Sequence, residues 1–315
     1  MPGNMIFKTK MKNQFRKFIK KSDWYTTTFM DCKKFWEGFP MGLDVVNLGS
    51  TSSVNAFNYD GIDKKCANWA MRPQTLYADF LVLQNYCSYL KPGSIVIIPL
   101  CPFSSLSSPR YLTKGADRYY TILASESIWP YSFEKYEQMA NIKNQPQRYY
   151  PLSSCVMDVL RKLHVVKRKK SKAITVSEAM LEADANNRIE SWKKEFSILD
   201  FNHPLRLHNL DMLDTAKELI REMVRFCKDR EYVPVVVVPP VSRPLAAMFP
   251  DYAVEQYVTP LLEVGKTVGA LVLDYIKDEE FGKSEYFQDS ICMNRIGASV
   301  FTQRVLKDTE EYGNK

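Results

Sequence analysis

The chain of 315 residues is 45% hydrophobic and 25% charged, and its 12 glycines and 17 prolines exclude collagen-like and low-complexity proteins. Its 43 basic and 36 acidic side chains leave a formal charge of +7, which permits an anionic partner without requiring one. The longest apolar runs, 95–100 and 233–241, fall short of the ~20 residues of a membrane-spanning helix. The seven cysteines form no CxxC pair, so we expect neither metal nor cofactor. Their odd number, without a secretory-signal pattern, predicts a cytoplasmic protein.

Residues 1–40 form a basic segment with one thin apolar stripe. The stripe consists of Phe7, Met11, Phe15, Phe18 and Ile19, which share one face of a predicted helix. Such a helix either packs on the edge of the domain with its charges in solvent, or lies on an anionic membrane surface. Because the stripe is thin, the sequence favours packing and predicts weak membrane contact at most.

From residue 41 onward, apolar strands alternate with amphipathic helices. Strands are predicted at Asp44–Leu48, Lys64–Asn68, Ser94–Leu100, Val233–Val238 and Gly269–Asp274. Helices are predicted at Gln74–Leu90, Leu210–Lys228, Tyr252–Val264 and Ile296–Leu306. This alternation is typical of a parallel sheet with helices on both faces. We expect an α/β fold with three α/β/α layers, in which residues 41–103 and 208–315 build a flavodoxin-like five-stranded parallel sheet.

The alternation breaks over residues 104–207, which we interpret as a helical insertion with its main helix at Val176–Phe196. The insertion leaves the core where a parallel strand ends, which is where such sheets bind ligands. One prediction is therefore a lid, whose Tyr and Trp side chains suit sugar rings. The alternative is an outward surface with the basic run Lys167–Lys172 in solvent. The charge excess and the aromatic pattern do not indicate nucleic-acid binding.

Three polar segments follow predicted strands and should meet at one edge of the sheet. They are Asn47–Ser53, Pro99–Phe103 and Tyr286–Ala298. The runs VVNLGSTSS, CANWAMRPQTLYAD and IVIIPLCPFS, with DSICMN before the last helix, together resemble the SGNH/GDSL hydrolases. More narrowly, they are similar to a branch found among bacterial polysaccharide-biosynthesis genes. The resemblance covers the core without the insertion, and it implies a flavodoxin-like sheet and ester chemistry on acylated carbohydrates or lipids.

Carried over residue by residue, the resemblance places Thr51 at the nucleophile position, with Ser50 beside it. Asp289 falls at the position of the acid that orients the base, and the base position holds Cys292. A thiol cannot take a proton from a hydroxyl as a neutral imidazole does. The glycine and asparagine that help to bind the oxyanion in the family have no counterparts in the second and third blocks. Two further candidates, for ligand binding at the same edge, are Ser52 and Arg72.

These residues also have structural interpretations. The serines and threonine of residues 50–53 and Asp289 could cap helices, and Cys292 could be an ordinary buried side chain. The chain has three histidines, His164, His203 and His208, and none of them is near Asp289 in the sequence. His203 and His208 are more often structural than catalytic in such positions.

Three functions are compatible with these features. The first is an SGNH-like protein of bacterial surface-polysaccharide metabolism that has lost its triad and binds an acylated carbohydrate or small ester. The second is an active carbohydrate esterase or O-acyltransferase, in which Ser50 or Thr51 uses a base from the insertion, such as His203 or His208. The third is a membrane-surface scaffold that uses the basic N-terminus. Because triad members act as a unit, the missing histidine favours the first function, and we expect Thr51, Asp289 and Cys292 to be neighbours.

Overall fold

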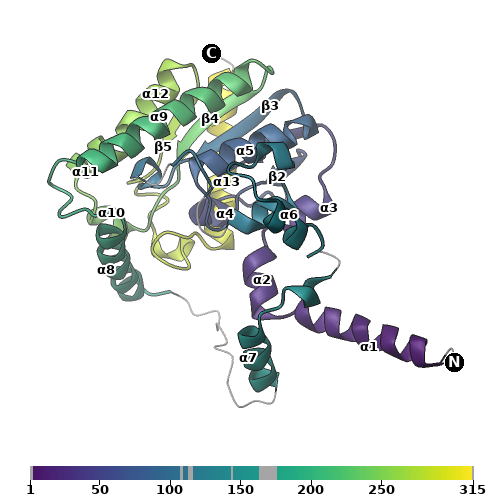
Figure 1. Cartoon of the computed structure of the whole chain (residues 1–315). Helices are drawn as coiled ribbons and strands as arrows, with labels where there is room; N and C mark the ends of the chain where they lie inside the picture. Colours follow the sequence, from purple (N-terminus) through teal and green to yellow (C-terminus); the bar gives the residue numbers. More distant parts are fainter. Residues whose placement is uncertain (1–2, 107–108, 113–115, 143–144, 163–175, 314–315) are drawn as a thin grey trace. The chain divides into compact units, whose positions relative to one another are not determined.

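The computed structural model describes residues 3–106, 109–112, 116–142, 145–162 and 176–313 (Figure 1). The chain divides into two compact units, one of residues 1–38 with 113–174, the other of residues 39–112 with 175–315. This grouping differs from the expected one. The N-terminal segment joins the middle of the predicted insertion, while residues 104–112 and 175–207 belong to the unit that contains the sheet.

The larger unit is built on a five-stranded sheet in which every strand pair is parallel. The strands are β1 (Leu43–Asn47), β2 (Cys66–Asn68), β3 (Leu90–Pro99), β4 (Val233–Val238) and β5 (Leu271–Asp274). Their order is β2-β1-β3-β4-β5, which is the flavodoxin-like order. The expected α/β fold with a five-stranded parallel sheet is therefore confirmed. Val96 of β3 lies opposite Val46 of β1 and Pro234 of β4, so the central strands are apolar on both faces.

Helices cover both faces of this sheet (Figure 1). The helices of the larger unit are α4 (Thr51–Ala56), α5 (Leu76–Tyr86), α8 (Glu178–Glu195), α9 (Leu207–Lys228), α10 (Arg243–Ala247), α11 (Asp251–Tyr257), α12 (Thr259–Thr267) and α13 (Arg295–Gly313), of which α8 and α10 lie beyond the edge of the sheet. On one face, Val235 and Val237 pack with Phe301 of α13. On the other, Gly265 of α12 lies so close to Val236 that an added Cβ would be 3.1 Å from a Val236 methyl. Alternate residues of β4 thus face opposite helix layers.

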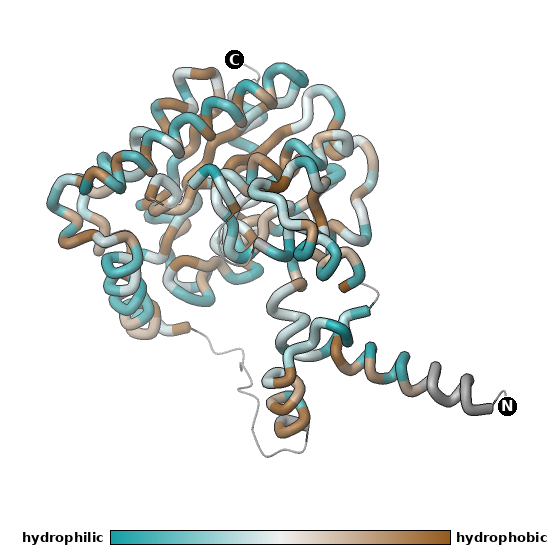
Figure 2. The backbone as a smooth tube through the Cα atoms, viewed as in Figure 1, coloured by the Kyte–Doolittle hydropathy of each residue, from teal (hydrophilic) through white to brown (hydrophobic). Residues whose placement is uncertain are grey.

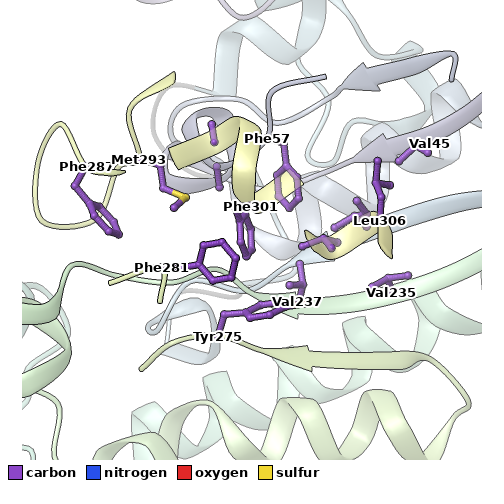
Figure 3. Packing of buried hydrophobic residues seen from close by; sticks show 14 of the residues in the cluster. Val45, Phe57, Val235, Val237, Tyr275, Phe281, Phe287, Met293, Phe301 and Leu306 are labelled. Carbon is purple, nitrogen blue, oxygen red and sulfur yellow. The ribbon is translucent and has the colours of Figure 1, made fainter. Parts of the chain in front are cut away.

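An aromatic cluster fixes α13 on the sheet. The ring of Phe301, fully buried, lies 5.7 Å from Phe57, 5.2 Å from Tyr275 and 5.6 Å from Phe281, measured between centroids. Figure 3 shows these rings together between the sheet and the loop that precedes α13. Edge-to-face pairs of this kind add to the free energy of area burial. The cluster therefore holds the end of the 287–294 loop at a fixed place beside the sheet.

Several element boundaries differ from the predicted ones. The helix predicted to reach Leu90 ends at Tyr86, and β3 begins at Leu90 instead of Ser94 because Leu90 pairs with Leu43 of β1. The helix predicted over 252–264 is two helices, because the second begins at Thr259 with Pro260, which cannot donate a backbone hydrogen bond, in its first turn. The last helix extends to Gly313 rather than residue 306.

The smaller unit contains short helices around an aromatic cluster. They are α1 (Gly3–Ile19), α2 (Asp23–Phe29), α3 (Lys33–Glu37), α6 (Phe133–Ala140) and α7 (Leu152–Lys162). Trp24 contacts Phe29 at 5.8 Å and Tyr150 at 5.6 Å between ring centroids, and Trp36 Nε1 donates to the Thr121 carbonyl at 3.1 Å. These contacts join the N-terminal segment to residues 113–162. Among the described helices, none is long and apolar enough to cross a membrane.

Replacement of Phe301 by alanine tests the role of this aromatic cluster. We expect Phe301→Ala to lower the free energy of unfolding by about 3–5 kcal/mol, because a buried ring is lost and a cavity remains. Ile296→Ala on the same helix is the matched control, since Ile296 is exposed and its removal leaves no cavity. Chemical denaturation of both variants measures the difference. Equal stabilities would show that α13 is not anchored through Phe301.

Candidate functional site

A buried carboxyl group holds the loop that follows β1. Asp79 Oδ1, on α5, accepts hydrogen bonds from the Gly49 N–H at 2.7 Å and from Gln74 Nε2. Burial raises the pKa of Asp79 to about 7, although these two hydrogen bonds act in the opposite direction. Gly49 has φ +110°, and an added Cβ would lie 2.3 Å from Ser53 Oγ. Only glycine fits this turn, so Gly49 and Asp79 together set where α4 begins.

Asp79 is not among the residues predicted from the sequence, although the pattern contains a signal for it. Asp79 lies three residues after Leu76 and four before Leu83, so it occupies the apolar face of its helix. An acidic residue at a core position is costly unless it is hydrogen-bonded or protonated. Such a residue therefore indicates a structural or functional partner in the fold.

The predicted nucleophile candidates lie at the start of α4. Thr51 is its first residue and is exposed, while Ser52 behind it is buried. Ser50 occupies the N-cap position but makes no capping hydrogen bond with its side chain; its Oγ accepts instead from the Gln74 N–H at 3.0 Å. Ser50 therefore links the loop after β1 to the turn after β2. That turn also contains Arg72, which is half-buried.

The asparagine at the end of β2 is used within the fold. Asn68 Nδ2 donates to the carbonyls of Val54 and Phe57 at 3.3 Å each, and its Oδ1 accepts from Asn47 Nδ2 at 3.1 Å. The same Oδ1 accepts the Ala70 N–H at 3.0 Å. This amide supports the C-terminal end of α4, so its donor hydrogens are directed at carbonyls of the protein.

The second predicted block forms a tight turn before α13. Asp289 Oδ1 accepts the N–H groups of Ile291 at 3.1 Å and Cys292 at 2.8 Å. The Cys292 thiol hydrogen-bonds with the Asp289 carboxylate and with Asn55. Burial and the Asp289 charge raise the pKa of this thiol to about 12. Cys292 is only 3% exposed, so the thiol is neutral and covered at ordinary pH.

Asn55 connects the two predicted blocks. It lies one turn after Thr51 on α4, and its Nδ2 donates to the Thr51 carbonyl at 2.9 Å. Because Asn55 also hydrogen-bonds with the Cys292 thiol, the 289–292 turn lies against α4. In the part of the chain that the structure describes, no hydrogen bond joins the Thr51 hydroxyl itself to Cys292 or Asp289. The blocks share one edge of the sheet, and their contact runs through Asn55.

A charged pair on α8 meets the Asp289 turn. Asp184 Oδ2 accepts from the Ser290 N–H at 2.9 Å, the Ser290 hydroxyl at 2.5 Å and Arg188 Nε at 2.7 Å. Arg188 also pairs with Asp289 Oδ2 at 3.2 Å. Burial opposes ionisation of Asp184, but the bonds from Ser290 and Arg188 outweigh it and hold its pKa below the ordinary value. Arg188 is therefore the cation between two carboxylates.

Asp184 and Arg188 are not among the residues predicted from the sequence. Their spacing, i and i+4, is typical of exposed ion pairs on helices, and nothing in the local pattern marks them as anything else. Only the fold shows that this part of the predicted insertion packs against the 289–290 turn.

The histidines of the insertion do not supply a base in the described residues. His203 is exposed and lies 3.8 Å from Asp200 in a small cavity that Arg206, Asn209 and Tyr257 also line. His208 is exposed in the first turn of α9. His164 and the Lys167–Lys172 run lie outside the described residues. The predicted insertion therefore places the Asp184 carboxylate and the Arg188 guanidinium beside the Asp289 turn.

Chemically, this edge combines the exposed Thr51 hydroxyl with a buried thiol that stays neutral at ordinary pH. The Asp289 carboxylate beside the Cys292 thiol pairs with Arg188 and accepts backbone N–H groups. No group of three or more His, Cys, Asp or Glu side chains among the described residues is placed to hold a metal ion. In comparisons with protein-family models and with curated proteins, no match to the chain was found.

Asp79 makes the stability of the fold depend on pH. Its raised pKa means that the folded state keeps a proton that the unfolded chain releases, so stability falls as pH rises from about 4 to 7. Asp79→Asn keeps the acceptor oxygen and carries no charge. We expect this variant to match the wild type at pH 4 and to exceed it at pH 8 by an amount on the order of 2–4 kcal/mol.

Denaturation curves at the two pH values measure this effect. Asp79→Leu is the control, because it leaves the Gly49 N–H unpaired and should be less stable at both pH values. A wild type that gains stability relative to Asp79→Asn on going from pH 4 to 8 would contradict a raised pKa.

Because Arg188 pairs with two carboxylates, we expect its loss to lower the free energy of unfolding more than the loss of an ordinary surface ion pair does. Arg188→Met leaves Asp184 and Asp289 without their shared cation and should lower stability by about 1 kcal/mol, a value reduced by solvent because the side chain is 30% exposed. Arg221→Met, which breaks a single pair with Glu218, is the control and should cost less. Adding Asp289→Asn to Arg188→Met should recover part of the loss. Equal costs for the two arginine variants would refute the bridging role.

Proposed function

We propose that this chain is an SGNH/GDSL-hydrolase-like protein with an impaired catalytic site, which binds an acylated carbohydrate instead of turning it over. The flavodoxin-like strand order supports the fold assignment. Support also comes from α4 and the 289–292 turn, which lie together at the carboxyl edge of the sheet. A role in bacterial surface-polysaccharide metabolism and a cytoplasmic location belong to the same proposal.

One observation carries the proposal: the group at the base position is a buried, neutral thiol whose carboxylate partner is also paired with Arg188. Serine and threonine hydroxyls need a base to become nucleophiles, and loss of one triad member removes most of the rate. In this arrangement Asp289 stabilises the turn before α13, but the neutral Cys292 thiol cannot accept the proton of the Thr51 hydroxyl. The edge is therefore suited to binding an ester more than to cleaving it.

The alternative is an active esterase or O-acyltransferase that uses Ser50 or Thr51. It requires a base within hydrogen-bond reach of one of these hydroxyls. The Ser50 hydroxyl accepts from Gln74, and α8 brings Asp184 and Arg188, which hydrogen-bond to each other. These contacts favour the binding function over the active enzyme.

Hydrolysis of p-nitrophenyl acetate tests the catalytic part of the proposal. We expect a wild-type kcat at least 1,000-fold below the ~10 per second of a typical enzyme. Thr51→Ser combined with Cys292→His should raise the rate at least about tenfold, because it places an imidazole beside Asp289. A wild-type kcat of about 10 per second that Thr51→Ala abolishes would refute the proposal.

Ligand binding tests the second part. We expect calorimetric titration with O-acetylated oligosaccharides to show binding that their deacetylated forms lack. Thr51→Trp should block it, because Thr51 is exposed at the proposed site. Thr267→Trp, on an exposed position of α12, is the control and should bind as the wild type does. Equal binding by acetylated and deacetylated sugars would show that the acyl group is not recognised.

A further inference from the structure

Helix α7 of the smaller unit exposes its apolar side chains. Leu152, Val156 and Val159 are 80%, 52% and 43% exposed, and their spacing of four and three residues places them on one face. Figure 2 shows hydrophobic residues along this helix. Single exposed apolar residues are ordinary on protein surfaces, but a continuous apolar helix face marks an interaction site.

The polar side of α7 faces its own unit. Asp158 Oδ2 accepts a hydrogen bond from the Tyr150 hydroxyl at 2.5 Å, and the Tyr150 ring packs on Trp24 of α2. Asp158 is the only acidic residue of α7. The helix is therefore oriented with its acid toward the unit and its apolar face away from it, the reverse of a helix that packs into a core.

Helix α1 combines an exposed apolar stripe with a strongly basic face. Met11 and Phe15, one turn apart, are exposed, and the Phe15 ring stacks with Phe18 at 6.3 Å between centroids. Ile19 is buried and Arg16 Nε donates to Gln147 Oε1 at 3.3 Å, which attaches the end of the helix to its unit. Contacts of this kind fit the packing interpretation for the last turn of α1, while Met11 and Phe15 before it are exposed.

The charge on α1 indicates which surface these helices fit. Residues 1–22 contain seven Lys and Arg and no Asp or Glu. Lys12 and Lys17 of α1 and Lys20 directly after the helix are exposed; Lys12 borders the stripe of Met11 and Phe15, and Lys17 lies on the opposite side of the helix. An apolar stripe with a cationic opposite face is the pattern of a helix that lies in the interface of an anionic bilayer. A protein groove would match the stripe but would not require a segment with seven cations and no acidic residue.

We propose that the smaller unit binds the surface of an anionic lipid bilayer through the exposed apolar faces of α1 and α7 and the basic residues of α1. The apolar side chains enter the boundary between headgroups and acyl chains, and the lysines contact the lipid phosphates. This proposal uses no residue of the site at the sheet edge, so it stands or fails independently of the proposed function.

Co-sedimentation of the full chain with lipid vesicles tests the proposal. We expect binding to vesicles of phosphatidylglycerol and phosphatidylcholine, and at least about tenfold weaker binding to phosphatidylcholine alone, with the difference shrinking at high salt. The apolar variant Val156→Asp with Val159→Asp should lower affinity for the anionic vesicles at least about tenfold. Its matched control, Leu199→Asp with Leu207→Asp, changes two exposed residues of the larger unit and should bind as the wild type does.

A charge variant gives an independent readout and leaves the apolar faces intact. Lys12→Glu, Lys17→Glu and Lys20→Glu together should also reduce binding at least about tenfold. The matched control with the same net charge, Lys194→Glu, Lys266→Glu and Lys283→Glu, places the changes in the larger unit and should keep most of the affinity. Circular dichroism of each variant verifies the fold.

Three results would overturn the proposal. The first is no binding of the wild type to anionic vesicles at low salt. The second is equal loss with both sets of lysine variants, which would mean that net charge alone drives association. The third is a wild-type dimer that Val156→Asp dissociates, which would assign the apolar face of α7 to a second copy of the chain.

Discussion

Parallel strands end at the same edge of a sheet, and this constraint decides where every candidate group of the larger unit lies. The turn after β1 and the loop that leads into α13 are about 240 residues apart in the sequence, yet Asn55 and Cys292 hydrogen-bond to each other. Their approach depends on the ring cluster around Phe301, which sets the position of α13, and on Asp79, which fixes the glycine turn before α4. Backbone geometry and core packing thus bring these two segments together, independently of any chemistry that their side chains perform.

The electrostatics of this edge are those of a stabilised turn. Asp289 is held by two backbone N–H groups, by the Cys292 thiol and by Arg188, and Asp184 compensates the same guanidinium from α8. A catalytic acid must instead orient a base that can change its protonation state. A buried thiol with a raised pKa does not change its protonation state near neutral pH, and the Asp289 turn is a compact charge network around it. Among the described residues, the neutral Cys292 thiol and the ion pairs of Arg188 are therefore consistent parts of one stabilised turn.

The sequence predicted the strands best where β-branched apolar runs are unbroken, as in Val233–Val238. It misplaced the start of β3 because Pro92 and Gly93 read as a helix stop, although their backbone continues a strand that already pairs at Leu90. It located Thr51, Asp289 and Cys292 at the right edge, since strand ends determine that edge. The role of Arg188 could not be predicted, because the spacing of an ion pair within one helix does not indicate which element that helix packs against.

The protonation state of Cys292 is the measurement closest to the central claim of the proposed function, since a thiol that stays neutral cannot act as the base that a hydroxyl nucleophile requires. Selective ¹³C labelling of cysteine Cβ atoms gives the titration of each thiol by NMR, and Cys292→Ser assigns the signal. The account predicts that the Cys292 signal shows no thiolate up to about pH 9, in line with a pKa of about 12. A titration with its midpoint near pH 7, shifted by Arg188→Met, would contradict it, because the thiol would then be poised to exchange a proton with a neighbouring hydroxyl.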